Sequence, residues 1–495
     1  MNKKIKSALV SVFNKDGLDE IVKLLSAKGV KIISTGGTAD FIKKLGIEVT
    51  EVETITKFPA VFDGRVKTLA PHIFGGILNR RDNENDKLEK EKNNIEDIDL
   101  VIVDLYPFEE TLASGASDAD IIEKIDIGGI ALIRAAAKNF NDVVVIPSKH
   151  QYKEIKEILE KGNETTLEQR KKFAGDAFNV TNTYDRAICG YFQGTTLRYG
   201  ENPHQSGKFI GNMEESFTQL HGKELSYNNL IDTEAAVMTV NDFTTPAFAI
   251  IKHMNACGLA TREEGHLLEA YEAAYKADPL SAFGGILASN RAVEEDIANK
   301  IKEQGLFVEV IIAPDFSPKA LEVLTEKKNI RILKWNNPTL PKEQMRTCFT
   351  GILVQDRDTH TESVSDFTVM TDRKPTEVEE KDLIMASIAT KHLKSNSVAL
   401  IKDGTLISMG CGQTSRIDAL EQAIDKAEKF GFSLVGSVLS SEAFFPFPDC
   451  VEMAGKAGVT AVIQPGGSKN DQASVDMCNT YKMAMVATGF RHFKH

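Results

Sequence analysis

Apolar runs alternate with amphipathic stretches through the first 50 residues. In chain order, the pattern predicts a strand at 5–12, a helix at 17–28, a buried strand at 30–34 and a helix ending near residue 46. Apolar runs at 99–107 and 143–146 predict two more buried strands. Because strands alternate with covering helices, this part is predicted to form a parallel α/β sheet.

The rest of the chain suggests a second domain built from two similar halves. Residues 81–97 mix both charge signs and predict a solvated loop, and residues 150–190 read as helical throughout. Gly190 and Gly194 follow, so we place the domains at 1–193 and 194–495. Apolar strands at 247–253 and 397–402 each follow a helical stretch and carry a basic residue at the end. We therefore expect subdomains at about 198–370 and 371–495, joined by the polar segment 371–381.

Composition and charge exclude several classes of protein. The formal net charge is -12, which argues against wrapping nucleic acid but leaves room for a local phosphate site. Apolar runs fall short of the roughly 18 residues that a membrane span needs. The basic start lacks a small-residue cleavage site, so no signal peptide is expected. Six scattered cysteines predict reduced thiols and a cytoplasmic protein.

A first group of polar residues lies at predicted strand ends. Ser11 and Lys15 follow the first strand, and the second is followed by Ser34, Thr35, Gly36, Gly37 and Thr38. Ligands of open α/β sheets gather at this edge, and glycines let the backbone approach them. We expect Thr38 to cap the next helix, whose N-terminus favours an anion. A plain glycine turn with a helix cap accounts for the same residues.

A second set extends this group with groups that can handle protons. Arg65 and Lys67 flank an apolar residue in a loop opened by glycine, so an extended loop would point both the same way. Tyr106 lies at a strand end, Asp126 at a helix start, and Lys138 further along. With Lys67 these residues form a proton-handling set that uses no metal. Each residue alone is equally compatible with a structural role.

A Lys-His pair marks the second domain. Lys252 and His253 end a buried strand, where successive side chains point to opposite faces. Both serve one site only where the strand breaks, and residues 255–258 are expected to supply that break. Histidine relays protons near neutral pH, and lysine stabilises an oxyanion. A capped strand end with a solvated lysine is the alternative.

Other clusters, and the motifs that are missing, narrow the chemistry. Residues 198–204 form an unusual cluster, residues 412–416 are expected to open a helix and cradle a phosphate, and residues 442–449 place three aromatic rings around a turn. Those rings can stack a flat heterocycle or fill a core. The chain lacks the C-x-x-C of a zinc deaminase and the Walker A motif.

Taken in order, the motifs resemble the bifunctional purine biosynthesis family, which joins phosphoribosylaminoimidazolecarboxamide (AICAR) formyltransferase to IMP cyclohydrolase. The resemblance runs from residue 5 to 495 and rests on SVFNKDGL, ISTGGT, GRVKTL, DLYPF, DIGG, LRYGENPHQ, IKHMNACG, SAFGGI, SNSV, GQTSRI and AFFPF. It implies an N-terminal methylglyoxal-synthase-like parallel α/β domain. It also implies a C-terminal pair of cytidine-deaminase-like α/β subdomains without zinc.

The resemblance further implies two reactions in a cytoplasmic homodimer, with no metal, nucleic acid or membrane partner. One transfers the formyl group of 10-formyltetrahydrofolate to AICAR, giving formyl-AICAR and tetrahydrofolate, and the other dehydrates and cyclises formyl-AICAR to IMP. Implied catalytic residues are Lys252 and His253 for transfer and Lys67, Tyr106, Asp126 and Lys138 for cyclisation. Implied substrate-binding residues are Ser11, Lys15, Ser34, Thr35, Gly36, Gly37, Thr38, Arg65, Thr68, Arg198, Tyr199, Asn229, Glu309, Asn396, Gln413, Ser415, Arg416, Phe444, Asp449 (near the folate) and Arg491.

The chain departs from the family pattern at four positions. Asp104 replaces an expected Asn, Ala70 an expected His and Pro448 an expected Arg, and Glu309 stands where Asp is frequent. Two alternatives to the bifunctional enzyme are a nucleotide sensor without catalysis and a single-activity lyase built on the first domain. The intact Lys252–His253 and Lys67–Tyr106–Asp126–Lys138 sets argue against the sensor, and the long second domain argues against the lyase.

Overall fold

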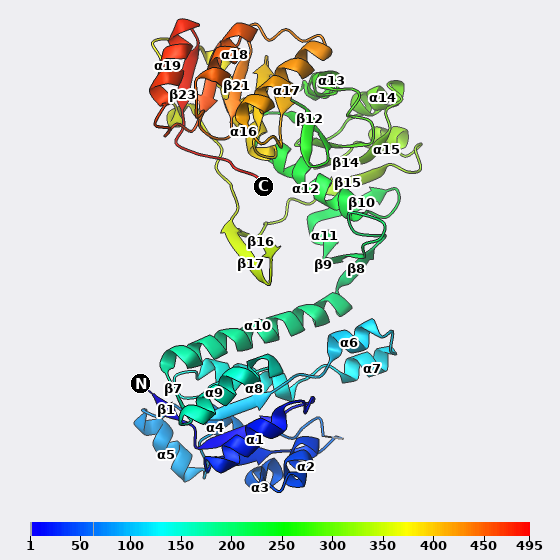
Figure 1. The fold of residues 1–495 in the computed structure, drawn as a ribbon. Helices are drawn as coiled ribbons and strands as arrows, with labels where there is room; N and C mark the ends of the chain where they lie inside the picture. Colours follow the sequence, from blue (N-terminus) through cyan, green and yellow to red (C-terminus); the bar gives the residue numbers. More distant parts are fainter. Residues whose placement is uncertain (1, 63) are drawn as a thin grey trace. The chain divides into compact units, whose positions relative to one another are not determined.

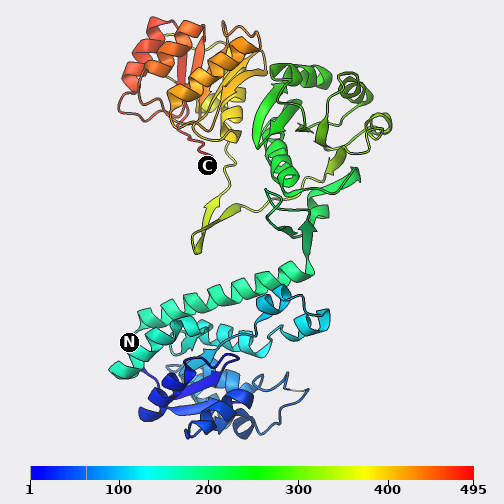
Figure 2. The ribbon, with the colours of Figure 1, turned by 45° about the vertical axis from the view of Figure 1, so that its right-hand side comes forward.

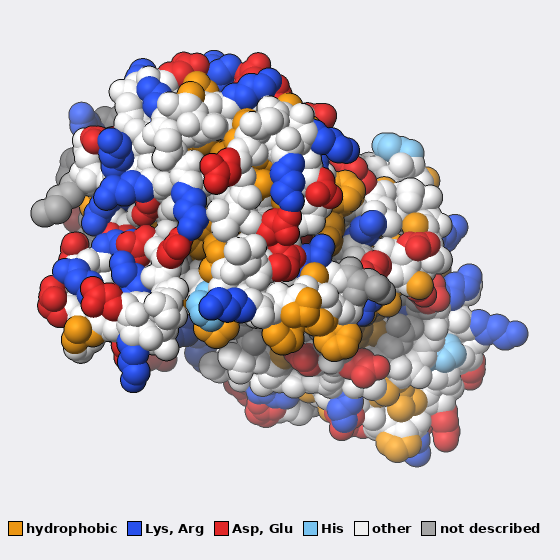
Figure 3. Space-filling model, turned by 90° about the horizontal axis from the view of Figure 1, so that it is seen from below, with side chains coloured by type: hydrophobic (Ala, Val, Ile, Leu, Met, Phe, Trp, Pro, Cys, Tyr) orange, Lys and Arg blue, Asp and Glu red, His pale blue; other side chains and the backbone are white. Residues whose placement is uncertain are grey.

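The computed structural model describes residues 2–62 and 64–495. The chain divides into two compact units, Met1–Gly194 and Thr195–His495, each with its own sheet (Figure 1). Figure 3 shows Lys and Arg side chains interleaved with Asp and Glu over the visible face. Among the described residues, no helix has both the length and the hydropathy needed to cross a membrane.

The first unit is a parallel sheet covered by helices, as predicted. Its strands lie in the order β4-β3-β2-β5-β6, with bounds Thr50–Glu51, Lys31–Ser34, Ser7–Ser11, Leu100–Val103 and Val144–Ile146. Its main helices are α1 (Leu18–Ala27), α2 (Gly36–Lys44), α4 (Pro71–Leu78), α8 (Gly128–Lys138), α9 (Tyr152–Lys161) and α10 (Leu167–Phe192). Shorter pieces are α3 (Val52–Thr56), α6 (Phe108–Ala113), α7 (Asp118–Glu123) and η1 (Lys149–Gln151). Parallel strands share one carboxyl edge, so Ser11, Ser34 and the residues after Val103 lie along it.

Two expectations about this unit are wrong. Residues 81–97 are not simply a loop, because Glu84–Lys92 form helix α5. The Asn83 side chain caps this helix by accepting from the Asp86 N–H, and acidic residues in its first turn and lysines in its last favour the dipole. The helical stretch at 150–190 is also interrupted, because Gly162 ends α9 and β7 (Glu164–Thr165) pairs with β1 (Lys3–Lys4).

The second unit contains a structural repeat built around one long sheet. The strand order is β10-β15-β14-β13-β11-β12-β20-β19-β21-β22-β23-β18. The first half runs α12 (Tyr227–Asn241), β11 (Ala247–Lys252), β12 (Asn255–Thr261), α13 (Leu267–Ala277), β13 (Gly285–Ser289), α14 (Glu295–Glu303), β14 (Val308–Ala313), α15 (Pro318–Leu324), β15 (Arg331–Trp335). The second runs α16 (Glu377–His392), β19 (Val398–Lys402), β20 (Thr405–Gly410), α17 (Arg416–Lys429), β21 (Val438–Ser441), α18 (Asp449–Ala457), β22 (Ala461–Gln464), α19 (Asp471–Thr480), β23 (Ala484–Ala487). The same order of elements and the same strand order recur in both halves.

Each half adds an edge strand before its first helix. Strand β10 (Phe217–His221) pairs with β15, and β18 (Thr368–Val369) pairs with β23, both antiparallel. The halves join where Ala260 of β12 pairs with Thr405 of β20. Outside the long sheet lie β8 (Gly194–Leu197), β9 (Gly207–Ile210), α11 (Met213–Ser216), η2 (Val364–Asp366) and the exposed hairpin β16 (Glu343–Cys348) and β17 (Gly351–Asp356).

The two faces of the long sheet are packed differently. Helices α12 and α16 share one continuous core that spans both halves. On the other face, α13–α15 and α17–α19 bury separate cores, one in each half. Helices therefore cover both sides of this sheet (Figure 2), and functional side chains are left to the strand ends and turns.

Candidate active sites

The loop after β3 is tied to the sheet by its hydroxyl groups. Ser34 donates to the Val10 carbonyl at 2.7 Å, and Thr38 donates to the Val12 carbonyl at 2.9 Å. The expectation that Thr38 caps the following helix is wrong, because α2 begins at Gly36 and Thr38 lies in its first turn. The first backbone N–H groups of α2 lack partners within the helix, so they can receive an anion.

Lys67 brings its charge to this helix start. A Cβ atom built on Gly36 would lie 3.1 Å from the Lys67 Nζ, and one on Gly64 would collide with the Lys67 chain. Arg65 instead pairs with Glu123 at the end of α7. The expectation that both cations point to one place is therefore wrong: Lys67 lies against the N-terminus of α2 and Arg65 contacts the acidic α7.

Tyr106 and Asp126 meet at the start of α8. The Asp126 carboxylate accepts from the Gly129 N–H at 2.6 Å and from the Tyr106 backbone N–H. Burial raises the pKa of Asp126 although both bonds oppose the shift, and burial with the Asp126 and Glu123 charges raises the pKa of Tyr106. The Thr68 Oγ1 lies 3.1 Å from a Cβ built on Gly128, so residues 67–68 join this edge.

Asp104 fastens the loop after β2. Its carboxylate accepts from the N–H groups of Phe13 and Asn14, the latter at 3.0 Å, and burial raises its pKa. Lys15 donates to the Val12 carbonyl at 2.6 Å and the Phe13 carbonyl at 2.9 Å. The Phe13 ring packs edge-on against Tyr106 at 5.6 Å between ring centres. The substitution at Asp104 therefore supports the loop that carries Ser11 and Lys15.

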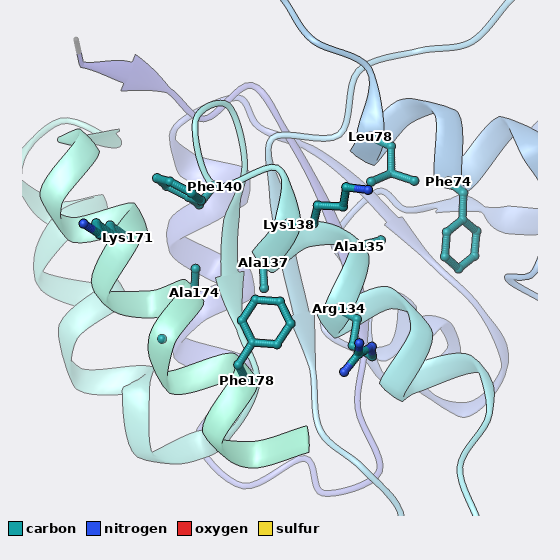
Figure 4. A pocket seen from close by; sticks show the side chains of 11 residues that line it. Phe74, Leu78, Arg134, Ala135, Ala137, Lys138, Phe140, Lys171, Ala174 and Phe178 are labelled. Atoms are coloured by element: carbon teal, nitrogen blue, oxygen red, sulfur yellow. The ribbon is translucent and has the colours of Figure 1, made fainter. Parts of the chain in front are cut away.

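Lys138 lies away from the other proton-handling residues. It ends α8, so about 15 Å of helix separates it from Gly128, beside Asp126. Figure 4 shows Lys138 and Arg134 on a pocket of about 680 Å³ with Phe74, Leu78 and Phe178. The expected grouping of Lys138 with Tyr106 and Asp126 is therefore wrong for this structure.

In the second unit, the Lys-His pair lies on a hairpin turn. Strand β11 ends at Lys252, and His253 and Met254 have φ of 51° and 64°, as in a two-residue type I′ turn. The expected break at 255–258 is wrong, because Asn255 begins β12. The Lys252 Nζ donates to the Phe283 carbonyl at 2.8 Å and the Gly284 carbonyl at 3.1 Å. The reversal of the chain, not a loop, lets both residues serve one end of the sheet.

Strand ends of the second half form a buried polar cluster. Arg416 donates to the Asn396 Oδ1 at 3.2 Å, the Glu442 carboxylate at 2.8 Å and the Phe444 carbonyl at 3.1 Å. Glu442 also accepts from the Ser397 N–H at 3.0 Å, and its side chain is fully buried. Sequence reasoning placed Asn396, Arg416 and Phe444 in the site but assigned no role to Glu442.

The two clusters of the second unit meet across the junction of its halves. The Asn255 Oδ1, directly after the His253–Met254 turn, accepts from the Lys394 N–H at 3.2 Å. Lys394 lies two residues before Asn396. The repeat therefore places the reactive turn of one half beside the polar strand ends of the other.

Comparison with known proteins identifies the family. The model of the AICARFT/IMPCHase bienzyme matches residues 136–426, and that of the MGS-like domain matches residues 17–131. The chain belongs to the AICARFT/IMPCHase bienzyme family. The bifunctional purine biosynthesis protein PurH of Bacteroides thetaiotaomicron is 53% identical, covering 100% of this chain and 99% of that protein. PurH of Persephonella marina is 46% identical, covering 99% and 100%.

One solved structure adds a local match. The chain titled "Crystal structure of ForH" is 31% identical and covers 38% of this chain and 96% of its own length, with a TM-score of 0.34. As a member of the AICARFT/IMPCHase family, the chain has the expected methylglyoxal-synthase-like N-terminal part and is a bifunctional formyltransferase and cyclohydrolase.

The remaining candidate residues of this bienzyme lie among local partners. Asn229 forms a capping box with Ser226 at the start of α12, and Ser415 accepts from the Asp418 N–H at 3.1 Å as the cap of α17. Other local partners are as follows: Glu309 with Arg331 at 2.7 Å, the Arg198 guanidinium 5.4 Å from the Tyr199 ring, Arg491 4.6 Å from the Phe493 ring, Gln413 through its backbone with Asn396, and Asp449 with the Cys450 N–H. Their ordering does not depend on the Lys252–His253 turn.

Asp232 is the residue of the bienzyme that sequence reasoning missed. From α12 it accepts the Met254 N–H at 2.8 Å and the His253 N–H, and burial raises its pKa while the nearby His253 and Lys252 charges oppose the shift. A signal was present, because Asp232 precedes Lys252 by 20 residues and Asp382 precedes Lys402 by the same interval.

The C-terminal segment is held by a histidine between two carboxylates. The His492 ring contacts Asp358 at 2.6 Å and Glu362 at 3.0 Å. Burial lowers the pKa of His492, but these hydrogen bonds and charges outweigh it and raise the pKa to about 9. The H-x-E spacing at 360–362 thus contributes Glu362 to this clamp. Among the described residues, no group of three or more His, Cys, Asp or Glu is placed to hold a metal ion.

Proposed function

We propose that the two activities of this bienzyme reside in separate units. Formyl transfer belongs to Thr195–His495, at the Lys252–His253 turn, and ring closure belongs to Met1–Gly194, at the edge formed by Lys67, Tyr106 and Asp126. The observation that carries the proposal is the anchored Lys252 ammonium beside a histidine whose turn is held rigidly.

The proposed transfer uses 10-formyltetrahydrofolate as co-substrate. The AICAR amine is conjugated with its ring and is a weak nucleophile, so His253 removes its proton as the nitrogen attacks the formyl carbon. An ammonium has three donors, and carbonyls take two from Lys252, which leaves one for the tetrahedral oxyanion. Collapse of the intermediate breaks the bond to the folate nitrogen, which takes up a proton, and gives formyl-AICAR and tetrahydrofolate.

The nucleotide is proposed to bind where the halves join. Asn396, Arg416 and Phe444 already form one cluster near the turn. The other binding residues in this proposal are Arg198, Tyr199, Asn229, Glu309, Gln413, Ser415 and Arg491, with Asp449 toward the folate. Binding by the nucleotide would draw the peripheral members toward the cluster.

Ring closure is proposed at the carboxyl edge of the first sheet. The N-terminus of α2 and Lys67 hold the phosphate, with Ser11, Lys15 and residues 34–38 shaping the loop. Asp126 takes a proton from the carboxamide nitrogen as it attacks the formyl carbon, and Tyr106 donates toward the departing water. We leave Lys138 out of this set because of its distance along α8. Side chains carry every proton and charge, so the scheme uses no metal.

The test supplies AICAR and 10-formyltetrahydrofolate and follows tetrahydrofolate and IMP. Lys252→Ala is expected to stop transfer but still cyclise supplied formyl-AICAR, and Lys67→Ala is expected to do the reverse. If folded Lys252→Ala loses both reactions, the assignment to separate units is wrong.

We also propose a cytoplasmic homodimer, from the family resemblance and the six free thiols. Light scattering after gel filtration tests the dimer, since a monomer mass would refute it. Fractionation of cells tests the compartment.

A further inference from the structure

The two halves of the second unit carry the same turn on the same support. His253 and Met254 have φ of 51° and 64°, and Asp403 and Gly404 have the same values. Lys402 ends β19 as Lys252 ends β11, and its Nζ donates to the Val435 carbonyl at 2.7 Å. The scaffold of strand, lysine and turn is therefore duplicated, and the residues at the turn differ.

Each turn is held by an aspartate from the preceding helix. Asp382 of α16 accepts the N–H groups of Asp403 and Gly404, both at 2.8 Å. Asp232 of α12 accepts those of Met254 and His253. The carboxylate thus fixes both peptide groups of the turn in each half.

The two turns differ in how much they need this support. Asp-Gly is a favoured type I′ sequence, because Gly adopts positive φ freely and Asp tolerates it. His253 and Met254 are both side-chain-bearing residues in the left-handed region, which disfavours the turn. Two hydrogen bonds to a charged acceptor offset that cost. The first turn therefore depends on its aspartate more than the second does.

We propose that Asp232 is a positioning residue for formyl transfer, holding the His253–Met254 turn so that His253 and Lys252 face one substrate. This inference rests on the proposed roles of Lys252 and His253. Asp232→Asn replaces an acceptor oxygen with an amide NH₂, which faces one of the two turn N–H groups and cannot accept from it. The turn loses its register, and His253 moves relative to the anchored Lys252.

The experiment compares Asp232→Asn with Asp382→Asn in the full chain. We expect Asp232→Asn to lower kcat for transfer by at least about 10-fold with KM for AICAR within about 3-fold, since small misplacements cost rate strongly. Asp382→Asn is expected to keep kcat within about 2-fold. Cyclisation of supplied formyl-AICAR is unchanged in both. A loss of kcat without a change in KM separates positioning from general loosening of the binding site.

A rescue variant keeps the test decisive if Asp232→Asn folds poorly. Replacing Met254 by Gly in the Asp232→Asn chain recreates a glycine-containing turn, and we expect it to recover at least about 3-fold of the lost kcat. Equal kcat in the two Asn variants, or no recovery by the folded double variant, overturns the positioning role. Lys252→Ala separates the two ideas: if it retains transfer, the proposed site is wrong, whatever Asp232 does.

Discussion

Replacing Glu442 tests whether the polar cluster at the end of β21 is a built part of the second unit. The Glu442 side chain is fully buried, and Arg416 is 9% exposed and 2.8 Å away. Glu442→Gln keeps an oxygen for the Ser397 N–H but leaves the Arg416 charge buried without its counter-ion. Removal of one partner from a buried pair costs about 3–5 kcal/mol. Since one hydrogen bond remains, we expect about 3 kcal/mol at the lower end of that range.

The assay uses the only tryptophan of the chain. Trp335 lies in the second unit and packs on the core that both halves share, so its fluorescence in urea follows this unit alone. A probe within one unit is needed because chains with several units do not unfold in one step. Glu442→Gln is also expected to weaken formyl transfer, through Asn396 and Arg416, and to leave cyclisation intact.

Glu452→Gln is the matched control. Glu452 pairs with Lys456 at 2.6 Å, but both side chains are largely exposed, so little change in stability is expected. A loss below about 1 kcal/mol in Glu442→Gln, equal to that of the control, would refute the reasoning, because it would mean that Arg416 finds water or another partner at no cost.

Three further predictions follow from the same geometry. With its pKa raised to about 9, His492 stabilises the fold fully below pH 6.5 and loses this as pH rises to 9; His492→Gln is expected to flatten that dependence in urea unfolding by about 3 kcal/mol. Gly284→Ala places a Cβ 3.1 Å from the Lys252 Nζ and should lower transfer, whereas Gly436→Ala, also at positive φ, should cost similar stability and spare transfer. Asp126→Asn should lower cyclisation by about 100-fold in initial rates and leave transfer unchanged; equal losses in both reactions would contradict it.

Local patterning predicted much of the fold because burial leaves a periodic record in the chain. The strands of the first sheet and the repeat in the second unit were both visible as apolar runs of the right length. Helix α5 was missed because its residues are polar all round, so it carries no buried face to detect. Its cap and charge order were the only available signals.

Motifs identified the chemistry more readily than the geometry. The order of motifs was enough to indicate the family, and the comparisons confirmed it. The roles of Thr38 and Lys138 were misjudged because each lies near its supposed partners in sequence terms only. Thr38 turns toward Val12, and Lys138 lies at the far end of a helix.

By itself, the sequence determined the α/β class, the two-part organisation, the family and the residue types that can carry formyl transfer and ring closure. Tertiary structure alone decided that Lys252 and His253 lie on a reversing turn, that Asp232 holds this turn, and that Glu442 joins Arg416. Hydrophobic periodicity reports which face of an element is buried, and it is local. Hydrogen bonds between residues 20 or more positions apart depend on how elements pack, which no local pattern records.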